Sequence, residues 1–410
     1  MKKPYFALIP SGYAPYRIFT FLPANSDNDL GFYRTTGSSR VAENGLIEPI
    51  FSGLTSLDWL NSSCPRLKSE ETRTNLQIYS EDFTQNNWIK SNLSVTGNDT
   101  IDPKGVERAD KIIPNTVNTF HHVQNIITGS GYGYSSTYSV FVKKAGYSQV
   151  ELLLAYSASP FSTIAQVKFD LDTLETFGTT IGTAFEYQDY GNGWYRLQIN
   201  AIVSLGATSA ILRVAVFDQQ SQTFLGNGVD GLYVWGAQFE SLAAKASSYI
   251  PTLNFTASRQ GDQISSTALL NNAAKGTIFL DLKAENVTNL SMIKLQGSSG
   301  YNRIVFQFSS SSQLSVQVGL APAPPSFSYS YNHDQQRFRI AVAWERNGSL
   351  KIYINGVNVA TTSAGTLNGI SQFSFNAGYT TSNPFQGDVY EASVYNESLT
   401  DSELIELTTL

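Results

Sequence analysis

The sequence predicts an all-β protein built from two consecutive β-sandwiches that follow an irregular N-terminal segment. Two observations carry this prediction: short runs alternate apolar and polar residues at period two, and turns rich in Gly and Asn separate these runs at regular spacing. The composition agrees, because aromatic residues make up 12% of the chain and charged residues only 15%. Strands favour aromatic and β-branched residues, whereas disordered chains carry few aromatics and much charge.

The chain of 410 residues divides into four expected regions. Residues 1–75 show weak hydrophobic periodicity and many turn signals, so we expect a docking segment that packs on a neighbour rather than folding alone. Residues 76–251 form the first sandwich, residues 252–275 a mixed linker, and residues 276–410 the second sandwich.

Period-two alternation predicts the strands of the first sandwich at residues 137–143, 149–156, 194–199, 211–216 and 231–236. The Gly- and Asn-rich run at residues 189–194 predicts a tight turn before one of them. Regularly spaced short strands of this kind are typical of a sandwich or jelly roll.

The second sandwich is predicted from strands at residues 276–282, 303–308, 339–344, 349–354 and 357–360. Asn355 and Gly356 lie between the last two and indicate a type I′ hairpin. One helix is expected, at residues 400–407. Thr400 is its natural N-cap, and Glu403 three residues later completes a capping box.

Charge and cysteine content exclude several classes of function. The net charge is −6 and no basic cluster occurs, so we expect no nucleic-acid partner. Cys64 is the single cysteine, which excludes an internal disulfide framework and a thiolate zinc site; we interpret it as a small packing residue. No apolar run approaches the roughly 18 residues of a membrane span, and prolines interrupt the short apolar start, so we expect neither membrane insertion nor a signal peptide.

No catalytic constellation stands out, so we expect no enzymatic activity. The paired carboxylates that a glycosidase would need are best interpreted as solvated strand and turn residues: Asp170 with Asp172, Glu186 with Asp189, and Asp388 with Glu391. His121 and His122 are adjacent on an expected strand and therefore point to opposite faces. His333 lies in a polar loop.

A metal or cofactor has weak support. Asp230 lies in the run at residues 226–231, which fits a β-turn better than a calcium loop. Oxygen ligands suit a hard cation, so Asp230 is the residue that would contribute to calcium binding there. We otherwise expect no cofactor.

Aromatic residues in loops are the candidate glycan contacts. A planar ring can stack on the apolar face of a sugar, and exposed aromatics also mark protein interfaces. The loop contexts point to Tyr132, Tyr134, Tyr379 and Phe385. Packing or interface roles are the alternative for each of them.

A spaced set of motifs over residues 34–265 resembles a module of phage tail-fibre and head-fibre structural proteins. The set begins with SRVAENGLIE at 39–48 and CPRL at 64–67, followed by EETRTNL at 70–76 and YSEDF at 79–83 with Trp88. It continues with YSVFVK at 138–143 and GWYRL at 193–197. It ends with WGAQFE at 235–240, SYIPT at 248–252, and Arg259 with Asp262. The resemblance implies a jelly roll similar to a carbohydrate-binding module.

The C-terminal block resembles concanavalin A-like or laminin-G-like domains. The motifs are IYING at 352–356, FQGDVYEA at 385–392, VYN at 394–396 and LTDSEL at 399–404. Glu397 departs from the family, which has a basic residue at this point. In relatives, the late strand and the terminal helix are structural.

These resemblances imply a non-enzymatic virion structural protein, made in the host cytoplasm and assembled into a bacteriophage. It would be a fibre, spike or capsid-decoration subunit, anchored to tail or capsid proteins through residues 1–75. Its sandwiches would present a surface for host glycan adhesion, and such fibres imply self-association, with a homotrimer as the usual state. Two alternatives stay open: a phage glycan depolymerase, and a purely architectural subunit with no ligand.

Overall fold

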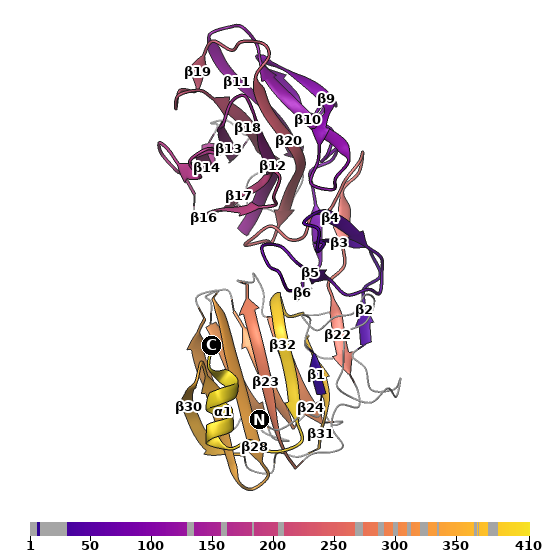
Figure 1. Cartoon of the computed structure of the whole chain (residues 1–410), viewed down its shortest axis with the longest axis vertical. Helices are drawn as coiled ribbons and strands as arrows, with labels where there is room; N and C mark the ends of the chain where they lie inside the picture. The colour runs from indigo at the N-terminus through magenta and orange to yellow at the C-terminus, as the bar shows by residue number, and fades with distance from the viewer. Residues whose placement is uncertain are drawn as a thin grey trace. The chain divides into compact units, whose positions relative to one another are not determined.

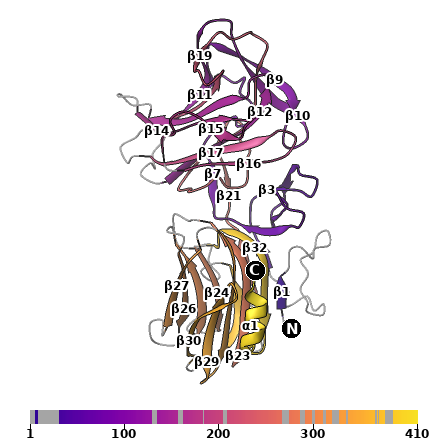
Figure 2. The same ribbon diagram turned by 60° about the vertical axis from the view of Figure 1, so that its left-hand side comes forward.

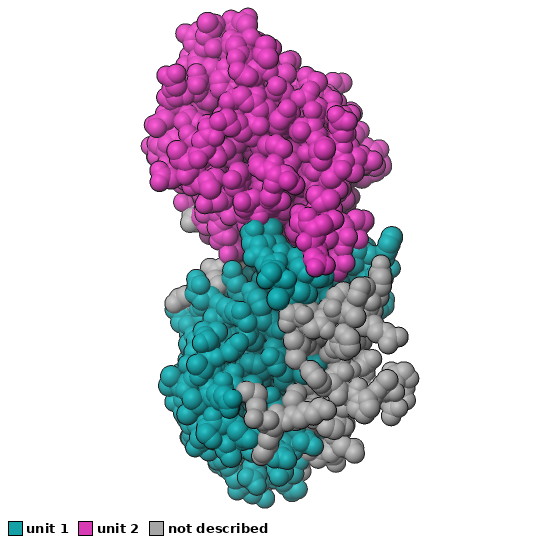
Figure 3. Space-filling model, viewed as in Figure 1, with its two compact units in different colours: residues 1–37, 50–72, 260–410 teal, residues 38–49, 73–259 magenta. Residues whose placement is uncertain are grey.

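The computed structural model of the chain is shown in Figures 1 and 2. It forms two compact units. Unit 1 comprises residues 1–37, 50–72 and 260–410, and unit 2 comprises residues 38–49 and 73–259 (Figure 3). The structure describes residues 6–8, 31–128, 135–156, 162–182, 184–203, 209–266, 274–285, 291–297, 302–309, 313–319, 327–333, 336–364, 367, 369–375 and 384–410.

Unit 2 is a sandwich of two antiparallel sheets. One sheet has the order β16-β17-β12-β20-β10-β9. Its strands are β9 (Leu93–Ile101), β10 (Glu107–Pro114), β12 (Ser135–Ala145), β16 (Ala184–Asp189), β17 (Tyr195–Ile202) and β20 (Gly231–Ser241).

The other sheet of unit 2 has the order β15-β14-β13-β18-β11-β19, and β8 also pairs with β11. Its strands are β8 (Ile89–Ser91), β11 (Thr119–Thr128), β13 (Gln149–Tyr156), β14 (Ser162–Asp170), β15 (Glu175–Thr176), β18 (Ser209–Phe217) and β19 (Thr223–Phe224). Alternate residues of the two sheets, such as Val140 and Val142 from β12 and Leu152 and Leu154 from β13, fill the core between them.

Unit 1 is a second sandwich of two antiparallel sheets. Its first sheet, the back sheet, has the order β30-β29-β28-β23-β32-β6-β5, with β1 also on β32. Its strands are β1 (Phe6–Leu8), β5 (Leu57–Asp58), β6 (Arg66–Ser69), β23 (Lys275–Ala284), β28 (Arg337–Glu345), β29 (Ser349–Ile354), β30 (Val357–Ser363) and β32 (Gly387–Tyr395).

The second sheet of unit 1, the front sheet, has the order β2-β22-β31-β24-β25-β26-β27. Its strands are β2 (Gly31–Tyr33), β22 (Gln263–Ser266), β24 (Ser291–Gly297), β25 (Arg303–Phe308), β26 (Gln313–Gly319), β27 (Phe327–Asn332) and β31 (Ile370–Ser374). Ile278, Leu280, Ile304 and Phe306 are among the side chains of the core between the two sheets.

The prediction of an all-β protein is confirmed, and each predicted strand coincides with an observed one. Asn355 and Gly356 have φ of 48° and 81°, the positive values that a type I′ turn needs. Helix α1 (Asp401–Thr408) starts at the predicted capping box, in which Thr400 N–H donates to Glu403 Oε2 over 2.8 Å. In the described part of the chain, no helix has the length and apolarity to cross a membrane.

Helix α1 covers part of the outer face of the back sheet. Leu404 and Leu407 pack there against a small separate core that includes Phe279, Ala341 and Tyr353. Figure 2 shows the helix on the side of β23 that faces away from β24, β26 and β27. The front sheet therefore carries no helix from the described residues.

The N-terminal segment supplies strands to both units. In unit 1, β6 pairs with the start of β32 through Asp388 and Lys68, and β1 pairs with its end through Ala7 and Ser393. Figure 1 shows β1 beside β32. In unit 2, β3 (Ser38–Val41) pairs with β4 (Ile47–Ile50), and β7 (Arg73–Asn75) pairs with β21 (Ala257–Arg259). Residues expected to be an irregular docking segment and a linker thus contribute ordered strands.

Asn75, from the motif at residues 70–76, is buried and acts as a backbone bridge within unit 2. Its Nδ2 donates to the carbonyls of Ala237 and Ile250, and its Oδ1 accepts from the amides of Gln77 and Phe239. One side-chain amide therefore satisfies four backbone groups that would otherwise be buried unpaired. This accounts for an Asn at this position on structural grounds.

Candidate functional site

Of the four predicted glycan contacts, the structure describes only Phe385. Tyr132, Tyr134 and Tyr379 lie outside the described residues, so their role stays a prediction. Phe385 is fully buried, with ring centroids 5.1 Å from Phe308 and 6.2 Å from Phe375.

The burial of Phe385 has a local cause. Its amide donates to the Phe375 carbonyl and its carbonyl accepts from Ser69 Oγ, so the backbone on both sides is fixed. The structure therefore places this ring in the core of unit 1 and not on a loop surface where a sugar could stack.

Asp230, the candidate calcium ligand, takes part in a turn. Its Oδ2 accepts from Asn227 Nδ2 over 2.6 Å, while Asn227 Oδ1 accepts from the amides of Val229 and Asp230. Across the residues that the structure describes, no group of three or more His, Cys, Asp or Glu side chains could hold a metal ion. Calcium binding at Asp230 stays a prediction.

The histidines do not converge on one site. His121 is buried and its ring nitrogens contact the carbonyls of Asn92 and Phe224, at 2.6 and 3.0 Å. His122 lies on the opposite face of β11 beside Phe120, as the strand geometry predicts. His333 is buried between the rings of Phe308 and Phe338. Cys64, expected to pack in the interior, is exposed.

Asp388 and Glu391 were expected to be solvated, and the structure corrects this expectation. Asp388 forms an ion pair with Arg66 Nε over 2.8 Å. Burial raises the pKa of Asp388, although Arg66 and Lys68 act in the opposite direction. Glu391 accepts from Ser393 Oγ, and burial raises its pKa as well. Asp388 is held in place because β6 pairs along the start of β32 and brings Arg66 and Lys68 to it. Glu391 lies beyond this pairing, and the cation that acts on it is Arg339.

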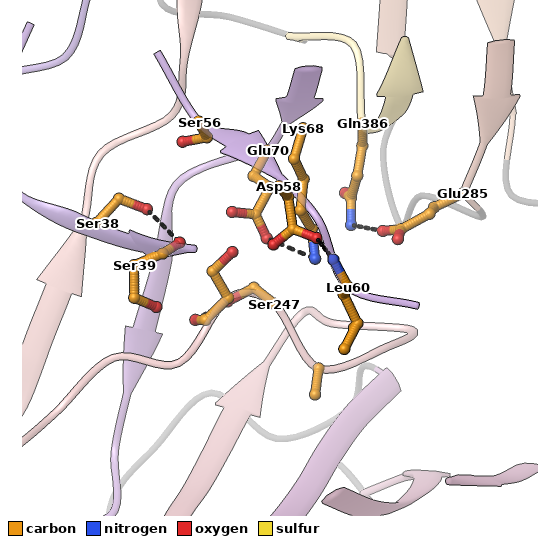
Figure 4. Close-up of polar contacts among 12 residues, drawn as sticks. Ser38, Ser39, Ser56, Asp58, Leu60, Lys68, Glu70, Ser247, Glu285 and Gln386 are labelled. Atoms are coloured by element: carbon orange, nitrogen blue, oxygen red, sulfur yellow. Dashed lines mark hydrogen bonds and ion pairs between the residues drawn. The ribbon is translucent and has the colours of Figure 1, made fainter. Parts of the chain in front are cut away.

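The same cluster continues from β5 and β6 across unit 1. Arg66 also pairs with Asp58 over 3.1 Å, and Asp58 Oδ1 accepts from the Leu60 amide over 2.9 Å. Figure 4 shows Lys68 and Glu70 pointing toward one another, with 3.9 Å between Nζ and Oε1. The internal pairing of these charges makes them a structural cluster that holds the N-terminal strands on β32.

The front sheet presents a different surface on the side away from the core. Ile293, Leu295, Ile304, Phe306 and Val316 point into the core, so the residues that alternate with them point outward. We call this surface the glutamine face and define it by Lys294, Gln296, Arg303, Gln307, Ser315, Gln317 and Gln372, with Tyr33 at its edge.

Strand register aligns these side chains in rows across the sheet. Gln372 lies opposite Gln296, which lies opposite Arg303 on the next strand. The next row contains Lys294, Val305 and Gln317, and Gln307 lies opposite Ser315 in the row after that. With neighbouring strands about 4.8 Å apart, the seven strands of the sheet extend over roughly 29 Å. The aligned residues occupy four of these strands, roughly 14 Å, and form a mainly polar strip in which Met292 and Val305 are the apolar members.

The amides on the glutamine face are linked in pairs and keep unused hydrogen-bonding capacity. Gln296 Nε2 donates to Gln372 Oε1 over 2.9 Å, and Gln317 Nε2 donates to Gln307 Oε1 over 3.0 Å. Gln296 Oε1 is buried and has no hydrogen-bond partner among the described residues. A buried acceptor without a donor costs free energy, and a ligand hydroxyl could contact this oxygen only after the Gln296 side chain turned outward.

The outward positions of the glutamine face contain no Asp or Glu. A glycosidase needs two carboxyl groups about 5–10 Å apart on either side of the scissile bond. The face can therefore hold hydroxyl groups by hydrogen bonding and lacks the residues for acid–base hydrolysis. Tyr33 is 58% exposed and adds one ring on which an apolar surface can stack.

Sequence reasoning did not find this face. Alternation at residues 303–308 indicated which side chains of one strand point away from the core. The missing information was which strands are neighbours, because β24, β25 and β26 are joined to β31 and β22 only by long-range pairing.

Comparison with known proteins supports the fold of unit 1. Residues 258–405 match the family described as Concanavalin A-like lectin/glucanases superfamily. This confirms the concanavalin A-like prediction for the C-terminal part of the chain. No curated protein matches the chain.

Several solved structures are similar to part of the chain. The CBM40 of the Ruminococcus gnavus IT-sialidase bound to α2,3-sialyllactose is 17% identical with a TM-score of 0.28, covering 34% of this chain and 84% of that one. Domain 4 of AbnA, an arabinanase from Geobacillus stearothermophilus in complex with arabinotriose, is 18% identical with a TM-score of 0.28 (40% and 82%). The enzymatically active domain of bacteriophage CBA120 tailspike protein 4 is 15% identical with a TM-score of 0.27 (40% and 21%).

Proposed function

We propose that the protein binds glycans without cleaving them, and that the glutamine face of unit 1 is the binding surface. The observation that carries the proposal is the aligned set of outward amides on neighbouring strands. The family match over residues 258–405, to lectins and glucanases, supports a carbohydrate ligand.

The chemistry of the face suits a sugar chain. Each sugar hydroxyl both donates and accepts, and a primary amide offers an oxygen acceptor beside two N–H donors. Rows that continue across β31, β24, β25 and β26 can serve several hydroxyls at once. Tyr33 supplies the apolar contact that hydrogen bonding alone lacks. An oligosaccharide lying along the strip is therefore a better fit than a single sugar.

A binding role is favoured over the depolymerase alternative by the placement of the carboxylates. The face carries none at its outward positions, and Asp388 is engaged with Arg66 in the structural cluster. Proton transfer to a glycosidic oxygen needs a carboxyl group within hydrogen-bond reach. The glutamine face therefore supports adhesion rather than hydrolysis.

We further propose that this binding unit belongs to a phage particle, as a fibre, spike or decoration subunit. The support is the spaced motif set over residues 34–265. Because β5 and β6 are strands of the back sheet, residues 50–72 would attach to virion proteins as part of a folded body rather than as a free tail. Self-association as a homotrimer belongs to the same proposal, and weak glycan contacts would then add through avidity.

The binding proposal is tested by screening the full chain on a glycan array, followed by titration of the best ligand against variants. Gln296→Ala and Gln307→Ala should each weaken binding about fivefold to tenfold, the loss of one or two net hydrogen bonds. Gln336→Ala is the matched control, because Gln336 is exposed and lies outside the face. Equal affinity of all three variants and the wild type would contradict the proposed surface.

The particle proposal needs a separate measurement. Mass spectrometry of purified virions should detect the chain at a constant copy number, and light scattering of the isolated protein should give three times its 44.9 kDa mass. A protein that is secreted free of particles would contradict the virion proposal. A stable monomer would contradict the homotrimer.

A further inference from the structure

Two cations lie next to each other on the glutamine face. Lys294 is on β24 and Arg303 is on β25, and they occupy diagonal positions because Lys294 pairs with Val305 and Gln296 pairs with Arg303. Side chains in this relation lie roughly 7–8 Å apart at their bases, close enough for both to contact one small group.

No acid balances this pair within the part of the chain that the structure describes. The cross-strand neighbours of Lys294 are Ser374 and Val305, and those of Arg303 are Gln296 and Gly319. All of these are uncharged. The pKa of Lys294 is lowered, first by burial and then by the charge of Arg303.

The location of the pair is unusual for this protein. The whole chain has a net charge of −6, so two uncompensated cations on one face do not follow from a generally basic surface. Elsewhere in unit 1 the buried Arg66, the half-buried Arg339 and the exposed Arg337 each contact a carboxylate. Keeping two like charges half-buried together costs free energy in the unbound protein.

We propose that the glycan bound at the glutamine face is anionic, and that Lys294 and Arg303 together hold its acidic group. This inference rests on the proposed function, because it concerns the ligand of the same surface. The acidic group is a carboxylate or a sulfate on a sugar ring. The planar fork of Arg303 matches the two oxygens of such a group, and the ammonium of Lys294 adds a point charge.

The rows place the rest of the ligand. Gln296 lies directly opposite Arg303, so a hydroxyl next to the acidic group would lie beside its side-chain amide. The combination of an anion contact and a neighbouring hydroxyl acceptor distinguishes an acidic sugar from a simple inorganic anion.

The test uses the full chain and ligand pairs that differ only in charge. Oligogalacturonides are compared with their methyl esters for the carboxylate, and sulfated with desulfated galactans for the sulfate. A glycan array that contains both kinds of pair covers other sugar backbones. The charged member of a pair should bind at least tenfold more tightly, and raising the salt concentration should reduce that difference.

Variants locate the effect. Arg303→Met and Lys294→Met should each weaken binding of the acidic ligand about tenfold or more and weaken binding of its neutral partner by a smaller factor, so that the preference for the charged ligand falls. Arg303→Lys keeps the charge and should recover part of the loss. Arg346→Met, which removes an exposed cation elsewhere in unit 1, should have no effect. Circular dichroism and thermal unfolding establish that each variant is folded.

The outcomes separate the two proposals. Binding of neutral glycans that depends on Gln296 but not on Arg303 or on ligand charge would overturn this inference and leave glycan binding intact. Failure of the wild-type protein to bind any acidic or neutral glycan on the array would overturn both. Tenfold selectivity for acidic ligands that survives Arg303→Met and Lys294→Met would overturn the assignment to these residues.

Discussion

Two titrating groups in unit 2 should have opposite effects on its stability at mildly acidic pH. His122 lies half-buried beside Phe120, and burial, followed by the charges of Arg213 and His121, lowers its pKa from 6.5 to about 4. Asp110 accepts from the amides of Phe83 and Asn98, yet burial raises its pKa from 3.8 to about 6.

The sign follows from which state holds the proton. Between pH 6.5 and 4 the unfolded chain protonates His122 and the native protein does not, so unit 2 loses stability as the pH falls. Between pH 6 and 3.8 the native protein protonates Asp110 before the unfolded chain does, so unit 2 gains stability as the pH falls.

The two contributions oppose each other. At 1.36 kcal/mol per pKa unit, the raised pKa of the buried Asp110 corresponds to about 3 kcal/mol, and the lowered pKa of the half-buried His122, after a reduction for solvent screening, to about 2 kcal/mol. They should therefore largely cancel in the wild-type protein. His122→Gln should make unit 2 about 2 kcal/mol more stable at pH 4 than at pH 7, relative to the wild type. Asp110→Asn should shift it by about 3 kcal/mol in the opposite direction.

Hydrogen exchange of buried amides in β12, corrected for the intrinsic pH dependence of exchange, measures the unfolding free energy of unit 2 within the full chain. The quantity of interest is the difference between variant and wild type at each pH, because all other titrating groups are common to both. If His122→Gln and the wild type give parallel curves between pH 4 and 7, the reasoning about His122 is refuted.

Three further perturbations follow from packing. Asn75→Ala leaves four backbone groups in unit 2 unpaired and should cost about 3 kcal/mol or more by chemical denaturation; an unchanged midpoint would contradict the bridging role. Thr400→Ala removes the N-cap of α1 and should cost about 1 kcal/mol, with Thr400→Ser close to wild type. A fragment of residues 276–410 lacks β1, β6 and Leu67 of the core, so light scattering should show aggregation where the full chain stays monodisperse or forms one defined oligomer.

Local features of the fold could be predicted because their signals lie within a few residues. The hairpin at Asn355 and Gly356 needs two positive φ values, and the capping box of α1 needs Thr400 and Glu403 three positions apart. The strands follow from period-two alternation, which depends only on which face of each strand is buried.

Non-local features could not be predicted. Residues 50–72 belong to unit 1 because Ser69 pairs with Gly387, and nothing in either segment alone indicates its partner. The same pairing places Arg66 next to Asp388, which is why that carboxylate is buried rather than solvated. Phe385 precedes this pairing directly and is held in the core by it. The glutamine face likewise depends on strand order.

The division of unit 1 by the intervening chain has a consequence for its biosynthesis. Ser69 leaves the ribosome 318 residues before its partner Gly387, a delay of roughly 16–64 s at 5–20 residues per second. During this time β6, with the charges of Arg66 and Lys68, has no partner on β32. In unit 2, β7 pairs with β21 through Arg73 and Arg259, so folding of unit 2 brings its two chain exits side by side. Folding of unit 2 thereby shortens the loop between β6 and β32. Closing that loop as an unfolded chain would cost unit 1 about 4–5 kcal/mol in conformational entropy. The nascent protein should therefore fold unit 2 first. The folded unit 2 then holds the two segments of unit 1 that flank it in the sequence close enough to pair.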